Sequence, residues 1–142
     1  MMFWDASAII PMYIEGPQTA VIRVLSERDG DLVAWWGTPV ECCSAFARLR
    51  RDGFLTTTDE DRMREMLSLL SETWTEIEPG SDVRETAERL LLSHPLRAAD
   101  SLQLAAALVW AGKHPKSNYF VCLDQRLRMA ARNEGFSVVP EE

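Results

Sequence analysis

Hydrophobic and polar positions along the chain follow two patterns, short apolar runs and longer segments in which apolar residues recur every three or four positions. Short apolar runs bounded by turn residues are typical of buried strands, whereas the longer spacing is typical of helices with one buried face. Strands are predicted at residues 3–4, 32–36, 74–77, 119–123 and 136–139. Because these strands alternate with predicted helices, the pattern indicates an α/β fold with a mainly parallel sheet covered on both faces.

Helices are predicted between these strands, and several of their ends carry recognisable signals. The predicted helices cover residues 7–13, 18–27, 39–51, 81–92, 96–111 and 124–133. Pro39 suits a first helical position, and Thr38 with Glu41 has the spacing of a capping box. Thr58 is expected to cap one further helix, and Gly53 is expected to end the helix that starts at Pro39.

Length and composition indicate one globular domain over residues 1–142. The formal net charge is −7 and the pI is about 4.9, which argues against a passive nucleic-acid binder, since such proteins are usually basic. The charge does not exclude a nuclease, because acidic metal ligands add negative charge that the bound metal reverses locally.

The cysteines and apolar runs give no sign of secretion or of membrane insertion. Cys42, Cys43 and Cys122 are odd in number and two of them are adjacent, which fits neither a disulfide framework nor a zinc-ligand spacing. The longest apolar run, at residues 104–111, is too short to span a bilayer, and the N-terminus does not resemble a signal peptide. A cytoplasmic protein is expected.

Four acidic residues stand apart from the other acids, most of which lie in polar segments. Asp5 and Glu41 are the only charges in residues 1–14 and 32–47, and Asp124 follows the apolar run 119–123. Asp100 lies near the start of a helix that is apolar on nearly every face, as buried helices are. A buried carboxylate without a partner would cost several kcal/mol or would take up a proton.

Each of these acids also has a purely structural interpretation. Asp5 and Asp124 could cap helices that follow strands, and Glu41 could complete its capping box. Asp100 could interact with the helix dipole or pair with Arg97. For any single acid this interpretation is the more common one, because caps outnumber functional sites.

Taken together, the four acids favour a metal site. Two of them follow strands and two lie in first helical turns, so all four are expected at the carboxyl edge of the sheet, where α/β proteins bind ligands. Four clustered carboxylates repel one another without a counterion. Hard oxygen ligands select Mg²⁺ or Mn²⁺, and the usual task of such a cluster is displacement at phosphorus.

The sequence resembles the PIN domain and, within that family, the VapC-type ribonuclease toxins of type II toxin–antitoxin pairs. The matching segments are residues 3–8, 39–41, 96–108 and 123–136, in the order expected for the family. The segments 96–108 (LRAADSLQLAAAL) and 123–136 (LDQRLRMAARNEGF) carry most of the specificity. Residues 54–80 match nothing specific.

The resemblance implies a three-layer α/β/α sandwich and cleavage of RNA that depends on Mg²⁺ or Mn²⁺. It implies that Asp5, Glu41, Asp100 and Asp124 are the catalytic, metal-binding acids, with Ser7 near the metal. The implied partners are an RNA substrate, a cognate antitoxin protein and a second copy of the chain. Cys122 departs from the family, which often has Ser or Thr there, and this puts a supporting hydrogen bond in doubt.

Four arginines are candidates for contacts with RNA phosphates, although for each one taken singly a solvated helix face is the more common interpretation. They are Arg48, Arg51, Arg97 and Arg126. Phosphate contacts of this kind add affinity without reading the base sequence.

Two other functions remain open at this point. A non-catalytic interaction module would bind RNA or a protein partner without cutting, which the acidic pI favours slightly and the intact set of four acids opposes. A metal-dependent phosphatase or DNA nuclease is the other alternative, since the choice of RNA rests on the resemblance alone.

Overall fold

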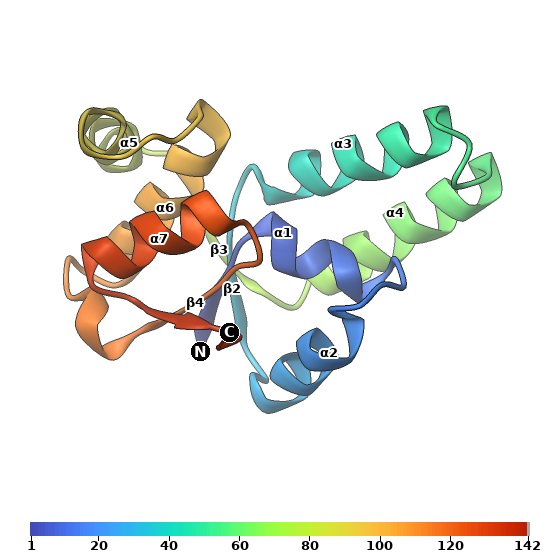
Figure 1. Cartoon of the computed structure of the whole chain (residues 1–142), viewed down its shortest axis with the longest axis horizontal. Coiled ribbons are helices and arrows are strands. Elements are labelled where there is room, and N and C mark those ends of the chain that lie inside the picture. Colours follow the sequence, from blue (N-terminus) through green and yellow to red (C-terminus); the bar gives the residue numbers. More distant parts are fainter. Residues whose placement is uncertain (142) are drawn as a thin grey trace.

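A parallel sheet of five strands forms the centre of the molecule (Figure 1), as described by a computed structural model for residues 1–141. The strands are β1 (Met2–Trp4), β2 (Leu32–Trp35), β3 (Thr75–Ile77), β4 (Tyr119–Val121) and β5 (Ser137–Val139). Their order is β3-β2-β1-β4-β5, and every neighbouring pair is parallel. The predicted α/β fold with a parallel sheet is confirmed.

The strand order reverses between β1 and β4. From β1 the chain builds outward through β2 to β3 and then returns to place β4 on the other side of β1. Phe3 of β1 is in register with Val33 of β2 and with Phe120 of β4. In open parallel sheets, a ligand site usually lies at the carboxyl edge where the strand order reverses. The connections that follow the two strands there run to opposite faces of the sheet and leave a crevice between them.

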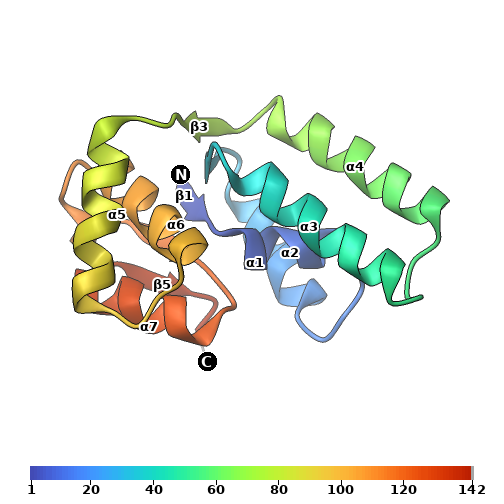
Figure 2. The ribbon, with the colours of Figure 1, turned by 90° about the horizontal axis from the view of Figure 1, so that it is seen from above.

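Helices cover both faces of the sheet, which confirms the three-layer α/β/α arrangement (Figures 1 and 2). One layer holds α1 (Ala6–Ile9), η1 (Ile10–Met12), α2 (Thr19–Arg28), α3 (Thr38–Arg51) and α4 (Thr57–Ser71). The other layer holds α5 (Ser81–Ser93), α6 (Ala98–Trp110) and α7 (Gln125–Glu134), and a short 3₁₀ turn, η2 (Pro115–Ser117), precedes β4.

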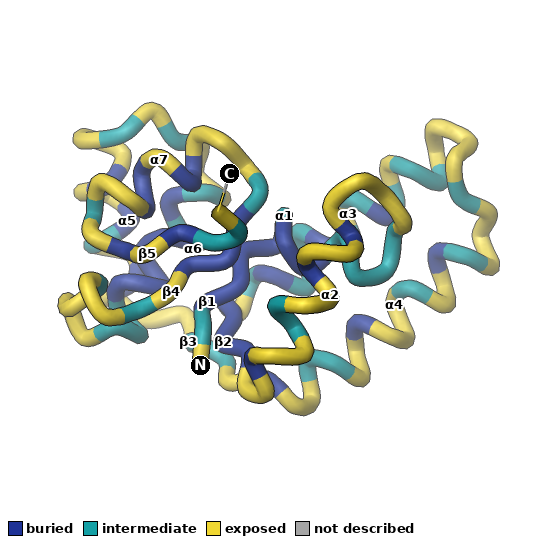
Figure 3. Tube along the Cα trace, turned by 60° about the horizontal axis from the view of Figure 1, so that its bottom comes forward, coloured by how far each residue is buried: buried dark blue, intermediate teal, exposed yellow. Residues whose placement is uncertain are grey.

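Two hydrophobic cores lie on the two faces of the sheet. Consecutive strand residues point to opposite faces, so Phe3 packs with α5, α6 and α7 while Trp4 packs with α1, α2, α3 and α4. All four residues of β2 are buried, as expected for a strand covered on both sides, and the burial is visible along the sheet in Figure 3.

Helices α3 and α4 form a hairpin whose far end extends away from the sheet (Figure 2). Gly53 ends α3 with a φ of +85°, a left-handed conformation that glycine adopts without strain. The Arg50 Nε atom donates to Glu60 Oε1 at 2.7 Å and joins the two helices. The first turn of α3 lies near the sheet, and its last turn lies at the far end of the hairpin.

Two predicted helix caps are wrong. The cap of α4 is Thr56 rather than Thr58, because Thr56 and Asp59 form a reciprocal capping box. Helix α3 begins after Gly37 without a side-chain cap, and the Thr38 hydroxyl instead accepts a hydrogen bond from Gln103. In the second case a contact between distant residues replaces the local capping pattern.

Within residues 1–141, no helix combines the length and apolar character needed to cross a membrane. Cys42, Cys43 and Cys122 are free thiols, as their spacing predicts.

Candidate active site

Asp5 and Asp124 lie at the carboxyl edge of the sheet, on the two strands between which the order reverses. Asp5 directly follows β1, is 3% exposed and caps α1 by accepting a hydrogen bond from the Ser7 backbone nitrogen at 3.2 Å. Asp124 follows β4 and caps α7 by accepting from the Leu127 nitrogen at 3.0 Å. The cap interpretation is therefore correct for both residues.

The capping bonds leave one oxygen of each carboxylate available. All hydrogen bonds that Asp5 receives within residues 1–141 go to Oδ2, and the capping bond of Asp124 goes to Oδ1. Capping and ligand binding are thus compatible on the same side chains.

Glu41 and Asp100 reach this edge from opposite helical layers. Glu41 lies in the first turn of α3 and Asp100 in the first turn of α6, and both are half-buried. The Gln103 side chain, one turn after Asp100, donates to Glu41 Oε2 at 2.6 Å and so joins the two helices above the sheet.

The electrostatics of these acids link them into one cluster. Burial raises the pKa of Asp5 to about 6, with a smaller contribution from the charge of Asp100. The pKa of Glu41 is raised to about 7, mainly by burial, with smaller contributions from the charges of Asp5 and Asp100. Burial and the neighbouring charge of Asp124 raise the pKa of Asp100. Asp5, Glu41 and Asp100 are therefore harder to ionise, mainly because they are buried and in part because another acid of the group is near.

Two arginines lie close enough to act on this cluster. The charges of Arg97 and Arg126 act to lower the pKa of Asp100 and offset part of the rise that burial causes. No ion pair within 4 Å joins either arginine to an acid in the described part of the chain. The cluster accordingly carries more negative charge than its neighbours neutralise.

The donor atoms fit a hard divalent cation, although the side chains do not already enclose one. The four acids offer only carboxylate oxygens, the ligand type that Mg²⁺ and Mn²⁺ prefer. Among the described residues, no three His, Cys, Asp or Glu side chains are arranged to hold a metal ion as they stand. The chemistry of the site suits such an ion, and its ligands would have to move to close around it.

Ser7 and Cys122 hold Asp5 from two sides. The Ser7 hydroxyl donates to Asp5 Oδ2 and accepts from the Leu123 backbone nitrogen at 2.9 Å, which ties the loop after β1 to the loop after β4. The Cys122 sulfur lies 3.5 Å from Asp5 Oδ2. Burial raises the pKa of the Cys122 thiol, so the thiol keeps its proton and acts as a weak donor where the resemblance led us to expect a hydroxyl.

The four candidate arginines fall into two groups. Arg97 is the residue before α6 and Arg126 lies in the first turn of α7, both beside the acidic cluster. Arg48 and Arg51 lie in the last turn of α3, roughly 10 to 15 Å along the helix axis from Glu41. Only the first pair is placed to contact a phosphate at the acids themselves.

Gln103 is the residue of this site that sequence reasoning missed. It is fully buried, and it is the one polar side chain among the otherwise apolar residues 102–111 of α6 and the turn that follows. Its position three residues after Asp100 was a usable signal, because residues three apart share a helix face.

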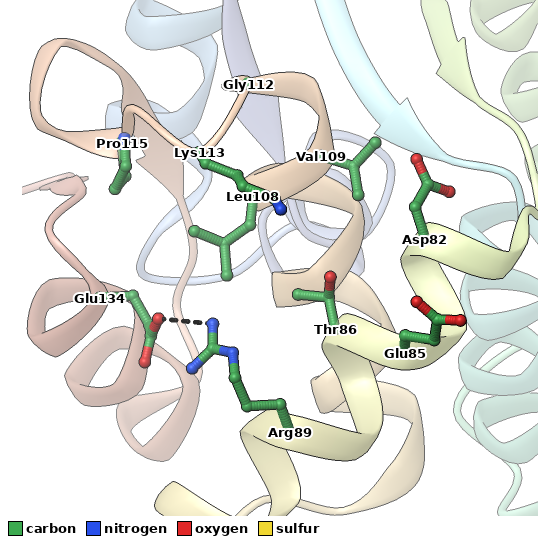
Figure 4. A pocket seen from close by; sticks show the side chains of 10 residues that line it. All are labelled: Asp82, Glu85, Thr86, Arg89, Leu108, Val109, Gly112, Lys113, Pro115 and Glu134. Carbon is green, nitrogen blue, oxygen red and sulfur yellow. Dashed lines mark hydrogen bonds and ion pairs between the residues drawn. The ribbon is translucent and has the colours of Figure 1, made fainter.

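A pocket of about 640 Å³ lies elsewhere and includes none of the four acids (Figure 4). It is lined by α5, by the C-terminal end of α6 and by Glu134 at the end of α7. Arg89 Nη2 lies 3.1 Å from Glu134 Oε1 across its wall. Arg89 therefore balances the negative charge of Glu134 in this pocket. The acids at the carboxyl edge of the sheet have no such ion pair among the described residues.

Comparison with known proteins gives a likeness in structure but none in sequence. No family model matches the chain, and no curated protein matches it. The chain is similar in structure to FitAcB from Neisseria gonorrhoeae, with a TM-score of 0.66 over 99% of this chain and 97% of that chain, at 17% sequence identity. The chain has a PIN-type fold. The PIN-type likeness extends over almost the full length, so it includes the sheet and both helical layers.

Proposed function

We propose that the chain is a divalent-metal-dependent ribonuclease that cleaves RNA phosphodiester bonds and acts as the toxin of a toxin–antitoxin pair. The observation that carries the proposal is the electrostatic coupling of Asp5, Glu41, Asp100 and Asp124 at the reversal of strand order. The PIN-type fold shared with FitAcB and the resemblance of the sequence to VapC-type toxins support the same conclusion.

In this proposal Asp5, Asp100 and Asp124 bind Mg²⁺ or Mn²⁺ through carboxylate oxygens, and Glu41 is a further ligand or positions the attacking water. A bound divalent cation supplies Lewis-acid stabilisation of charge on the phosphate. In the metal-free protein burial raises the pKa of Glu41 to about 7, and a carboxylate next to the bound cation would accept a proton from water as a general base. Ser7 and Cys122 keep Asp5 in its orientation.

Arg97 and Arg126 would contact phosphates next to the scissile bond, while Arg48 and Arg51 would contact RNA only if it also runs along α3. Such contacts stabilise binding without choosing a base. The choice of RNA over DNA, the antitoxin and a homodimer rest on the sequence resemblance, whereas a cytoplasmic location rests on the cysteine pattern and the short apolar runs of the sequence.

The experiment that tests the proposal is incubation of the purified protein, freed of any bound partner, with total RNA in the presence of Mn²⁺, Mg²⁺ or EDTA. Cleavage is expected with either metal and not with EDTA. Asp5→Asn should lose cleavage, while Asp61→Asn, an exposed acid on α4, serves as the matched control and should retain it. Full cleavage of the RNA by both wild type and Asp5→Asn in EDTA would contradict the proposal.

A second candidate, a non-catalytic PIN-like module that binds RNA or a protein partner, is favoured by one observation. Among residues 1–141, no three potential ligands are already arranged around a metal position. This candidate predicts RNA or partner binding that is indifferent to Mn²⁺ and to Asp5→Asn, with no cleavage of any RNA.

A further inference from the structure

Gln103 makes a contact between helices of the two opposite layers, at the edge of the sheet where the acids lie. Its side chain is fully buried, and its Nε2 atom donates to Glu41 Oε2 at 2.6 Å and to Thr38 Oγ1 at 2.9 Å. Both acceptors lie in the first turn of α3, whereas Gln103 lies on α6 in the opposite layer. One amide group therefore connects the two helices that bring Glu41 and Asp100 to the site.

The Gln103 amide directs its nitrogen toward α3. The ionised form of Glu41 accepts but does not donate, so that form pairs with the amide nitrogen and not with the amide oxygen. The two hydrogens of Nε2 then serve Glu41 and Thr38, one each. Within residues 1–141, the buried Oε1 atom of Gln103 has no hydrogen-bond partner.

The spacing of Asp100 and Gln103 along α6 relates the contact with Glu41 to the acidic site. Asp100 and Gln103 are three residues apart and share one face of the helix. One face of α6 thus carries both Asp100 and Gln103, the residue whose amide bonds to Glu41. Any shift of α3 relative to α6 would separate Glu41 from this donor.

We propose that Gln103 is a positioning residue that holds the Glu41 carboxylate toward Asp5 and Asp100, and that the Thr38 hydroxyl, by accepting a second hydrogen bond from the Gln103 amide nitrogen, restrains the Gln103 side chain. The positioning itself is a property of the folded chain, whereas its consequence for catalysis rests on the proposed function. Groups that orient a ligand are typically worth about 10- to 100-fold in metal affinity or activity when removed.

The direct test measures the Glu41 side chain in the metal-free protein by NMR, through the three-bond scalar couplings that report its χ1 angle. Wild type should show one rotamer. Gln103→Met, which keeps the length of the side chain and removes the amide, should show averaging over several rotamers. Ser101→Ala is the matched control, since Ser101 is also buried on α6 but bonds only to Ala98 of its own helix.

Thr38 provides a second and milder perturbation, which keeps the test valid if Gln103→Met does not fold. Thr38→Val removes the hydroxyl and should increase the averaging at Glu41, while Thr38→Ser retains the hydroxyl and should restore the wild-type couplings. A single, unchanged Glu41 rotamer in Gln103→Met or, failing that, in Thr38→Val would overturn the proposal.

Mn²⁺ affinity and turnover then connect the positioning with catalysis. In the wild-type background Gln103→Met should weaken Mn²⁺ binding about 10-fold and lower kcat about 10- to 100-fold, with KM for RNA nearly unchanged. In a Glu41→Ala background the same substitution should have no further effect, and an equal loss in both backgrounds would overturn the role assigned to Gln103. A wild-type protein that neither binds Mn²⁺ nor cleaves RNA would refute the proposed function alone, and the NMR couplings would still decide the positioning.

Discussion

Two groups of partly buried carboxylates in this molecule behave in opposite ways. At the edge of the sheet, burial raises the pKa of Asp5 to about 6 and that of Glu41 to about 7. At the end of α7, burial also acts to raise the pKa of Glu134, but hydrogen bonds from His94 and Arg89 outweigh it and the pKa is lowered.

The difference lies in where the positive charge comes from. The positive charge beside Glu134 comes from the same chain, because Arg89 Nη2 lies 3.1 Å from its carboxylate. His94 Nε2 lies 2.7 Å from the same carboxylate and adds charge when it is protonated. Asp5 and Glu41 receive only hydrogen bonds from neutral groups. Burial acts to raise the pKa in both groups, and the sign of the net shift depends on whether the chain itself places a cation beside the acid.

The largest expected effect comes from Asp100→Asn, which removes one charge from the edge of the sheet. We expect cleavage to fall by at least about 100-fold, the scale of losing one group that stabilises charge in a reaction. The wild type should be stabilised against thermal unfolding by about 2.7 kcal/mol when Mn²⁺ is about 100-fold above its Kd, and the variant much less. Differential scanning fluorimetry with and without Mn²⁺ measures this, and equal stabilisation of both proteins would remove Asp100 from the metal site.

The next prediction distinguishes the acids at the edge of the sheet from Glu134 by how the stability of the fold depends on pH. The folded-state pKa of Glu41 is raised from 4.5 to about 7, so ionising this group destabilises the metal-free fold progressively between these pH values. Glu41→Gln should therefore be more stable than wild type at pH 8, by roughly 1 to 3 kcal/mol, and nearly equal to it at pH 4. Urea unfolding at both pH values measures this. The exposed Glu65→Gln is the control, and a variant that is less stable than wild type at pH 8 would contradict the interpretation.

Glu134→Gln should show the opposite sign. Because the pKa of Glu134 is lowered in the fold, its contribution to stability is present above the unfolded pKa of about 4.5 and is lost as the pH falls further. We expect a loss of about 1 kcal/mol at pH 7 that disappears in acid, with RNA cleavage unchanged. Loss of cleavage in this variant would mean that the pocket beside Glu134 takes part in the reaction.

The smallest effects concern the arginines. Arg97→Gln and Arg126→Gln should each weaken RNA binding severalfold and reduce the salt dependence of binding by about one phosphate contact. Arg48→Gln should have less effect, because Arg48 lies in the last turn of α3, away from the acids. Titrations at several salt concentrations compare the three variants, and a larger effect at Arg48 would place the RNA path along α3 instead.

The parts of the site that depend on local sequence could be predicted, and those that depend on distant contacts could not. Asp5 and Asp124 each follow an apolar strand and begin a helix, so their place at the carboxyl edge is visible in a few neighbouring residues. The strand β4 was predicted to reach residue 123 but ends at Val121. The Leu123 nitrogen bonds to the Ser7 side chain rather than to a neighbouring strand, a contact between residues 116 positions apart.

The contact of Gln103 with α3 shows the same limit. The sequence indicates a polar residue on an apolar helix, but its partner at Thr38 lies 65 positions away. Thr38 and Glu41 have the spacing of a capping box, yet both turn to Gln103 because the packing of α3 and α6 over the sheet brings them together. The order of the strands is likewise set by packing and not by any local pattern.

The position of β1 between β2 and β4 has a consequence for synthesis of the protein on the ribosome. Strand β1 gains its second neighbour only after more than 110 further residues have been added, since β4 begins at Tyr119. Until then one edge of β1 stays unpaired, and Asp5 has not met Asp124. A nascent chain that has not yet reached β4 therefore lacks part of the acidic cluster, whatever that cluster does in the folded protein.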